Sequence, residues 1–397
     1  MKKTTFFLIA IISIIVIYLV INNGKNNNNS LDKKENEIIL LNKITPEEML
    51  SQMTLEEKIG QMLVVGFWGT EPDYYINKMI NARNIGGVIL MKYNISDREQ
   101  LIKLIKNLQD KSLNTSPGIP LFIAVDQEGG IVSRVEVEGV NELTAQKDIT
   151  STVQAYDVAK KRAIELKKIG INVNFSPVID MITNKNSFLY DRVFRSNEIN
   201  GVKVNTVELG HAMMKGYKQG GIIAVPKHFP GYENETDDPH EKMPMSMLLE
   251  KDLVYLQDNG SKNDSFRLRA FHYLIDEKDG RPEIIMSTPI IYKNIDSNNP
   301  AIFSKHFIKN FLRENLSYTG LIITDDMEMG ALSGYTTSEA AVKAVQAGND
   351  ILLYTSTPEK QAEAYNAIVE AIKKDEININ QINESVLKIL RLKKANL

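Results

Sequence analysis

The chain has 397 residues, 43% of them hydrophobic and 24% charged, which is typical of a folded globular protein and excludes a disordered one. Its net charge of −3 shows no global basic bias, so we expect no nucleic-acid partner. The absence of cysteine excludes disulfides, a thiolate nucleophile and every Cys-ligated metal site. The absence of an H-x-x-x-H pair gives a zinc enzyme little support.

The N-terminal residues differ in composition from the rest of the chain. Lys2 and Lys3 precede an apolar run over residues 6–21, whose length lies between that of a signal-peptide core and that of a full membrane span. Because no small-x-small cleavage site follows, residues 1–21 are predicted to form an uncleaved signal anchor, with the lysines inside and the rest exported. A cleaved signal peptide is the alternative. The Asn-rich residues 22–44 predict a polar flexible linker.

Residues 45–397 show no second break in composition and are predicted to form one catalytic domain. It begins with a helix, because Thr45 is a favoured N-cap residue and Pro46 is favoured at the first helical position. The segment from Thr54 to Glu57 has the pattern of a capping box and predicts a second helix start.

Eight short apolar runs follow, separated by longer amphipathic stretches such as residues 98–109, 153–168 and 338–347. Because the runs are continuously apolar, they are typical of parallel strands that are buried on both faces. Eight β–α units over this length favour an α/β fold of the (β/α)8 TIM-barrel type over a doubly wound sheet. The predicted strands are residues 63–67, 86–90, 121–126, 173–178, 222–228, 284–287, 321–325 and 351–354.

Ionisable residues lie at the C-terminal ends of several of these strands. They are Asp126, Lys227, His228, Asp325 and Asp326. A TIM barrel gathers the C-terminal ends of its strands into one active-site mouth. Each residue alone is compatible with an ordinary turn after a strand, but several at the same end of different strands indicate a site.

Residues 226–231 read P-K-H-F-P-G and are followed by D-P-H at 238–240. This string resembles the signature of the single-domain β-N-acetylglucosaminidases of glycoside hydrolase family 3, K-H-F-P-G-H-G followed by a short loop and D-S-H. The resemblance implies that Lys227 and His228 bind hydroxyls of the sugar in the −1 subsite. It also implies that Asp238 and His240 form an acid/base dyad.

A physical argument supports the contact within this dyad. Pro239 disfavours a helical conformation of Asp238, so we expect an extended segment. Residues two apart in an extended segment point to the same side, which lets the Asp238 carboxylate orient the imidazole of His240. Without the preceding K-H-F-P-G, the segment would be interpreted as a solvated acidic loop.

Residues 322–327, I-I-T-D-D-M, resemble the family's S-D-D-[LM] strand end. The resemblance implies that Asp325 is the nucleophile and that Asp326 is a neighbouring structural or site-shaping carboxylate. A retaining glycosidase needs a carboxylate that attacks the anomeric carbon and later leaves. A pair of helix N-cap residues after a strand is the alternative interpretation.

Residues 125–130, V-D-Q-E-G-G, together with Arg134 resemble the family's D-Q-E-G-G-R-V-x-R. The resemblance implies that Asp126 and Arg134 bind sugar hydroxyls, and the D-R-V-F segment at 191–194 implies the same for Arg192. A loop with an ordinary arginine salt bridge is the alternative. The resemblance covers residues 45 to about 395.

The sequence departs from the family pattern at several positions. Tyr232 and Glu233 replace a His-Gly pair, Pro239 replaces a small residue and Arg195 replaces a glycine. Residues 286–289, M-S-T-P, lack a histidine, and an insertion lies around residues 258–282. These departures leave the predicted catalytic residues intact but leave the sugar preference open.

We therefore expect a retaining, extracytoplasmic glycosidase that is attached to a bacterial membrane, acts as a monomer and binds a carbohydrate. The resemblance implies no metal and no organic cofactor. It is expected to remove terminal β-N-acetylglucosamine from cell-wall glycans through a covalent glycosyl–Asp325 intermediate. The alternatives are a β-glucosidase or sugar phosphorylase of the same family, or a non-catalytic exported sugar-binding protein.

Overall fold

The computed structural model describes residues 44–182, 184–195, 197–199, 202–204, 206–232, 237–250, 269–277 and 279–397. The chain divides into two units, Met1–Thr45 and Pro46–Leu397. The predicted signal anchor and nearly all of the predicted linker lie outside the described residues, as does much of the insertion. Within the described part of the chain, no helix has the length and apolar character needed to cross a membrane.

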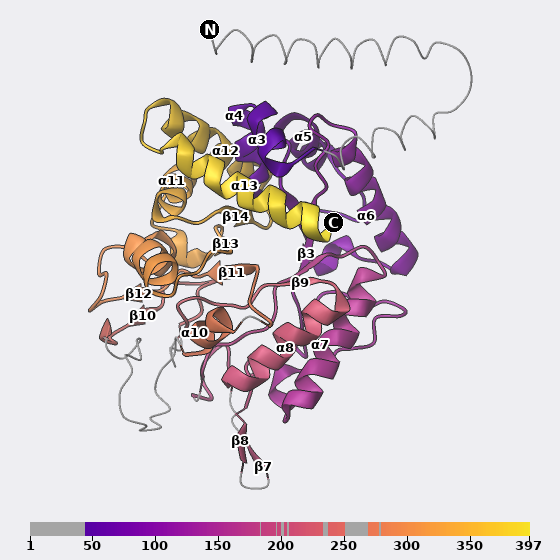
Figure 1. Ribbon diagram of the computed structural model, residues 1–397, viewed down its shortest axis with the longest axis vertical. Coiled ribbons are helices and arrows are strands. Elements are labelled where there is room, and N and C mark those ends of the chain that lie inside the picture. Colours follow the sequence, from indigo (N-terminus) through magenta and orange to yellow (C-terminus); the bar gives the residue numbers. More distant parts are fainter. Residues whose placement is uncertain are drawn as a thin grey trace. The chain divides into compact units, whose positions relative to one another are not determined.

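Eight parallel strands form the centre of the second unit (Figure 1). Their order in the sheet is β11-β13-β14-β1-β2-β3-β6-β9, and each overlaps one of the eight predicted strands. Their bounds are β1 (Leu63–Val65), β2 (Gly87–Leu90), β3 (Phe122–Val125), β6 (Val173–Asn174), β9 (Ile223–Ala224), β11 (Ile284–Ser287), β13 (Leu321–Asp326) and β14 (Ile351–Tyr354).

Hydrogen bonds join the two ends of this sheet beyond the assigned strands. Phe229 N donates to Met286 O at 2.7 Å, and Thr288 N donates to Phe229 O at 2.9 Å, which makes a parallel bridge between Phe229 and Ser287. The sheet is therefore a nearly closed eight-stranded parallel barrel, consistent with the predicted TIM barrel. Every residue of the eight strands except Asp326 is buried, as expected for parallel strands covered on both faces.

Helices follow most of the barrel strands (Figure 1). The predicted helices at 98–109, 153–168 and 338–347 correspond to α6, α7 and α11. The helix bounds are α3 (Pro46–Gln52), α4 (Leu55–Gln61), α5 (Tyr74–Arg83), α6 (Arg98–Leu113), α7 (Thr152–Lys167), α8 (Thr206–Gly220), α10 (Arg269–Asp276), α11 (Thr337–Ala347), α12 (Pro358–Lys373) and α13 (Ile379–Asn396). A π-helical segment, η4 (His306–Asn315), precedes β13.

In the part of the chain that the structure describes, three pairs of short strands lie outside the barrel. They are β4 (Gln127–Gly129) with β5 (Val132–Ser133), β7 (Asn197–Ile199) with β8 (Val202–Val204), and β10 (Met245–Ser246) with β12 (Ile291–Tyr292). The first pair carries the D-Q-E-G-G segment beyond the end of β3, which brings that segment to the C-terminal end of the barrel.

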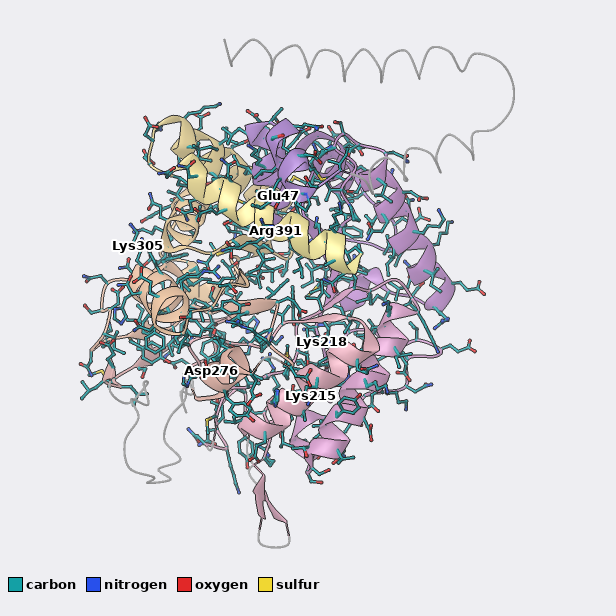
Figure 2. All side chains as sticks on the ribbon, viewed as in Figure 1. Glu47, Lys215, Lys218, Asp276, Lys305 and Arg391 are labelled. Atoms are coloured by element: carbon teal, nitrogen blue, oxygen red, sulfur yellow. The ribbon has the colours of Figure 1, made fainter. Side chains whose placement is uncertain are left out.

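The first helices begin where the sequence predicts. Helix α3 begins at Pro46, and Thr54 forms the predicted capping box with Glu57 at the start of α4. Glu47 of α3 and Arg391 of α13 form an ion pair of 2.6 Å, which links the first and last helices of the unit (Figure 2).

The N-terminal end of the barrel holds a buried amine. Lys393 of α13 is 2% exposed, and its Nζ donates to Gln61 Oε1 at 2.8 Å and to Gly86 O at 2.7 Å. Burial lowers the pKa of Lys393 well below its ordinary value. Gln61 lies two residues before β1 and Gly86 lies one residue before β2. This lysine is therefore at the N-terminal end of the barrel, where conserved features usually serve stability rather than catalysis.

Candidate active site

A cluster of four charged side chains lies at the C-terminal ends of β3 and β9. Lys227 Nζ is 2.6 Å from Asp126 Oδ1 and 2.7 Å from Glu128 Oε1. Arg192 forms a two-pronged ion pair with Glu128, with its Nε at 2.9 Å and its Nη2 at 2.7 Å from the two carboxylate oxygens. Pairing of this kind offsets the cost of taking charges out of water. The structure thus brings three predicted sugar-binding residues together.

The electrostatics of this cluster fix its charge state. Burial acts to raise the pKa of Glu128, but the charges of Arg192 and Lys227 outweigh it and hold the pKa well below its ordinary value. Burial acts to lower the pKa of Lys227, but the charges of Asp126 and Glu128 outweigh it and raise the pKa. Glu128 therefore stays ionised and orients two cations rather than exchanging a proton.

Glu128 is a site residue that sequence reasoning did not single out. It is 1% exposed and lies within the D-Q-E-G-G segment that carries the family resemblance. The available signal in the sequence was a glutamate two residues after Asp126, the aspartate that ends a predicted strand. A glutamate that is fully buried, as this one is, is almost always paired. Its partner Arg192 lies 64 positions along the chain, a contact that local patterns do not reveal.

Arg134 follows β5 and completes this side of the site. Its backbone N donates to Gln127 Oε1 at 2.9 Å. Its Nε is buried and has no hydrogen-bond partner among the residues that the structure describes. A buried guanidinium donor of this kind is suited to a ligand oxygen, which fits the sugar-binding role that the resemblance implies.

The carboxylate of Asp180 orients His228 through hydrogen bonds to its backbone and its imidazole. Asp180 Oδ2 accepts from His228 N at 3.0 Å and lies 2.8 Å from His228 Nδ1, while Asp180 Oδ1 accepts from Tyr232 N at 2.7 Å. Since an ionised carboxylate only accepts, Nδ1 carries the hydrogen and Nε2 is left for a ligand. Sequence reasoning also missed Asp180, which lies two residues after the predicted strand at 173–178.

Asp325 lies on β13 and is 9% exposed. Its Oδ1 accepts from Asp326 N at 2.9 Å and its Oδ2 accepts from Thr288 Oγ1 at 3.1 Å. Thr288 Oγ1 is also hydrogen-bonded to the Tyr232 hydroxyl. Because Thr288 gives its single hydrogen to the carboxylate, Tyr232 must donate to Thr288. Both oxygens of Asp325 are thus fixed, and two of the fixing residues lie where the sequence departs from the family pattern.

Asp238 and His240 form a close pair. Asp238 Oδ1 lies 2.7 Å from His240 Nδ1 and accepts from His240 N at 3.0 Å. These hydrogen bonds outweigh partial burial and lower the pKa of Asp238. The extended conformation expected for this segment is wrong, because Glu241 N and Lys242 N donate back to Asp238 O at 2.9 and 3.0 Å. The segment is a turn with Pro239 at its second position.

This turn is attached to the connection that follows β13. Gly330 N donates to His240 O at 3.1 Å, and Ala331 N donates to Pro239 O at 2.9 Å. The side chain of His240 is 62% exposed. Residues 233–236, which join the turn to the K-H-F-P-G segment, are outside the described residues.

Arg192 relates these parts electrostatically. Burial acts to lower the pKa of Arg192, but the charge of Glu128, together with those of Asp126 and Asp325, outweighs it and raises the pKa. Its own charge contributes to the lowered pKa of Asp238. The charged cluster, the strand end and the turn therefore share one electrostatic environment. Among the described residues, no group of three or more His, Asp or Glu side chains is arranged to hold a metal ion.

Asp326 offers a test of the electrostatics at this strand end. Burial raises its pKa to about 7, while its carboxylate accepts from Thr355 Oγ1 at 2.6 Å and from Glu328 N at 3.1 Å. Between the ordinary pKa and 7, the folded state binds a proton that the unfolded state does not. The free energy of unfolding should therefore fall as pH rises through this window, by up to about 4 kcal/mol at ~1.4 kcal/mol per pKa unit.

Asp326→Asn imitates the protonated carboxyl and should show a shallower fall than the wild type. Chemical unfolding at pH 5 and pH 8 measures both proteins, and their difference isolates Asp326 from other titrating groups. Equal pH dependence of the two proteins would show that this carboxyl is already ionised at pH 5.

The chain is similar to proteins of a known family. Residues 54–392 match the model described as "Glycosyl hydrolase family 3 N terminal domain". A beta-hexosaminidase A of Pseudoalteromonas piscicida is 30% identical over 343 residues, which are 80% of this chain and 54% of that protein. This chain thus spans about half the length of that relative. A beta-hexosaminidase of Methylobacillus flagellatus is 33% identical over 74% of this chain and 80% of its own length.

A solved structure is similar over most of the chain. It is a glycoside hydrolase family 3 beta-N-acetylglucosaminidase from Paenibacillus sp. str. FPU-7, with a TM-score of 0.75 and 30% sequence identity. The similar region covers 86% of this chain and 63% of that one.

Proposed function

The chain belongs to glycosyl hydrolase family 3, and we propose that it removes terminal non-reducing β-N-acetylglucosamine residues from glycans with retention of configuration. The observation that carries this proposal is the pairing of Asp238 with His240 at 2.7 Å. A histidine oriented by a carboxylate can give and take a proton near neutral pH. The activities named for the two similar proteins and for the similar solved enzyme support the same proposal.

In the first step, Asp325 attacks the anomeric carbon and forms a glycosyl ester. His240 Nε2 gives a proton to the leaving oxygen, because its Nδ1 is engaged by Asp238. A hydrogen bond to each oxygen of Asp325 holds its carboxylate in one orientation, so little reorientation is needed before it attacks.

In the second step, the neutral His240 takes a proton from water, which attacks the same carbon. The ester bond breaks and returns the carboxylate of Asp325, so the sugar leaves with its original configuration. The positive charge that His240 then carries is stabilised by Asp238, and its loss to solvent completes the cycle.

The charged cluster is proposed to bind the sugar that is cleaved. Asp126 accepts hydrogen bonds from sugar hydroxyls, while Lys227, His228, Arg134 and Arg192 donate to them. Ion pairing holds Lys227 and Arg192 in place before the sugar binds. These side chains therefore lose little conformational entropy during binding.

A panel of nitrophenyl β-glycosides tests the activity and the sugar preference. The N-acetylglucosaminide should be turned over at least tenfold faster than the glucoside. A faster glucoside would favour a β-glucosidase, and no turnover of any glycoside would favour a sugar-binding protein. Product analysis with added phosphate identifies a phosphorylase, because a sugar 1-phosphate would then replace the free sugar.

Gly330 provides a test of the proposed proton donor that leaves the catalytic side chains untouched. A Cβ at Gly330 would lie 2.5 Å from His240 O and 2.6 Å from Glu241 O, so Gly330→Ala must displace the turn that carries His240. We expect turnover of unactivated glycosides to fall roughly 10–100-fold, because a small misplacement of a catalytic group lowers the rate by about this much. Steady-state kinetics together with thermal unfolding separate this effect from loss of the fold.

Gly334→Ala is the matched control, because a Cβ at Gly334 meets nothing within 4 Å. Its turnover should equal that of the wild type. Equal activity of both variants would mean that the position of the 238–240 turn does not limit catalysis.

We also propose that the N-terminal segment attaches the enzyme outside a bacterial membrane, where wall-derived glycans are the available substrates. Lys2, Lys3 and the apolar residues 6–21 support this. Fractionation of cells should find the full-length chain in the membrane pellet, and protease should release it by cutting within residues 22–44. Recovery of a soluble form that lacks the apolar run would contradict the anchor.

A further inference from the structure

An aromatic pair, one exposed ring and one half-buried ring, lies on the connections that follow β1 and β2. The rings of Trp68 and Tyr93 stack with centroids 4.2 Å apart and planes inclined by 18°. Trp68 follows β1 by three residues, and Tyr93 lies in the short 3₁₀ helix η1 (Lys92–Asn94) after β2. Both therefore belong to the C-terminal end of the barrel. Trp68 is 56% exposed, and since one face lies against Tyr93, its other face is open to solvent.

The backbone around this tryptophan is held in place. Asn94 is 0% exposed, and its Nδ2 donates to Phe67 O at 2.9 Å and to Gly69 O at 2.7 Å. These two carbonyls flank Trp68. A single exposed apolar side chain needs no functional explanation. A ring that stacks on one face, and whose flanking backbone is held by a buried amide, is different, because it loses little freedom when a ligand binds.

The pair adjoins the catalytic strand end. Tyr93 Oη is 3.4 Å from Thr355 O, and Thr355 Oγ1 donates to Asp326 at 2.6 Å, the residue after Asp325. Burial, and then the charges of Asp326 and Glu328, raise the pKa of Tyr93. Tyr93 thus lies beside the strand end from which Asp325 acts, with Trp68 stacked on its ring.

We propose that Trp68, supported by Tyr93, is a platform for the sugar ring on the leaving-group side of the cleaved bond. A β-linked hexopyranose of the gluco configuration carries its substituents around the ring edge, so each face presents C–H groups and is apolar. Such a face stacks on an indole. The charged cluster around Lys227 is proposed to bind the hydroxyls of the sugar whose anomeric carbon is attacked. The open aromatic face of Trp68 is then available to the second sugar ring, on the leaving-group side. The inference depends on the proposed function and names the second ring of its substrate.

Intrinsic fluorescence tests this binding directly, because Trp68 is the only tryptophan of the chain. The full-length wild-type protein is titrated with a thio-linked disaccharide of N-acetylglucosamine, which resists hydrolysis, and with the monosaccharide. The disaccharide should change the Trp68 emission in a saturable way, and the monosaccharide, which fills the position of the cleaved sugar, should not. No response to the disaccharide, or an equal response to both, would overturn the proposal.

Kinetics of three variants provide the second readout. Trp68→Ala should lower kcat/KM for the oxygen-linked disaccharide about tenfold and leave kcat/KM for a β-glycosyl fluoride, whose leaving group has no ring, unchanged. Trp68→Phe should keep most of the wild-type value. Tyr74→Ala, at an exposed tyrosine of α5 outside the stack, should leave both values unchanged.

An equal loss on both substrates would show a structural role for Trp68, and an equal loss in Tyr74→Ala would move the subsite away from the stacked pair. Either outcome would overturn the proposal. If neither substrate is turned over, the proposed activity fails, whereas the fluorescence titration still decides whether Trp68 binds a sugar.

Discussion

Asp325→Asn should abolish nearly all turnover of β-N-acetylglucosaminides and leave the fold intact. An amide cannot form the glycosyl ester on which the two-step mechanism depends. Loss of a nucleophile in other hydrolases lowers kcat by roughly 10⁴–10⁶-fold, and we expect a loss in that range. Asparagine can keep the local hydrogen bonds, because its oxygen can accept from Asp326 N while its amide donates to Thr288 Oγ1, which then donates to Tyr232.

Asp326→Asn is the matched control, since it removes the neighbouring carboxyl from the same strand. It should retain activity within roughly tenfold of the wild type, because Asp326 contacts Thr355 and Glu328 rather than the reacting carbon. A fluorinated N-acetylglucosamine inactivator should label the peptide that contains residues 324–327. If Asp326→Asn is inactive and Asp325→Asn is active, the roles of the two carboxyls are exchanged.

The positions of the barrel strands could be predicted because buried parallel strands are apolar without interruption. The runs at 284–287 and 351–354 match β11 and β14 at both ends. The runs at 173–178 and 222–228 are longer than β6 and β9, which end at Asn174 and Ala224. Each run contains a proline, Pro177 or Pro226. Because proline lacks the N–H that a ladder requires, the pairing breaks there and resumes as the bridge between Val178 and Lys227.

The site was only partly accessible from sequence. The family motifs indicated Asp126, Arg192 and Lys227, which the structure brings together. They did not indicate Asp180, whose partners His228 and Tyr232 lie about fifty positions away. A carboxylate that orients a distant backbone segment leaves no periodic signal, so only the tertiary structure reveals it.

The conformation of the dyad shows how one residue pattern can serve two geometries. Pro239 restricts the residue before it, which led to the expectation of an extended segment. Proline is equally favoured at the second position of a turn that begins with aspartate, and the structure adopts this alternative. In the turn, the Asp238 carboxylate reaches both the backbone N and the imidazole of His240, so the contact forms for a different reason than the one expected.

Two residues at positions that depart from the family pattern, Tyr232 and Thr288, belong to an intact hydrogen-bond network. Tyr232 is 1% exposed and Thr288 is 0% exposed, and their hydroxyls form a chain to Asp325. Burial raises the pKa of Tyr232 well above its ordinary value, so its phenol remains a donor. A site that had lost its function would have no reason to keep such a satisfied buried network, which weighs against the non-catalytic alternative.

His240→Ala should slow the hydrolysis of alkyl glycosides far more than that of nitrophenyl glycosides. An acid catalyst matters in proportion to the need of the leaving group for a proton, and it contributes roughly 10²–10⁴-fold where that need is large. Nitrophenolate leaves without help, so formation of the glycosyl ester on Asp325 stays fast. The second step loses its base, and the ester should accumulate and give a burst of nitrophenol in rapid-mixing experiments.

Asp238→Asn should show the same pattern with a smaller loss, because the imidazole remains while its orientation and charge stabilisation are weakened. The side chain of His240 is 62% exposed, so its removal creates no cavity and thermal unfolding should not change. Plotting log kcat/KM against leaving-group pKa for the wild type and both variants measures the effect as a change of slope. An equal loss for all leaving groups in His240→Ala would mean that His240 does not donate the proton, and the 237–242 segment would then be a solvated acidic turn beside the site.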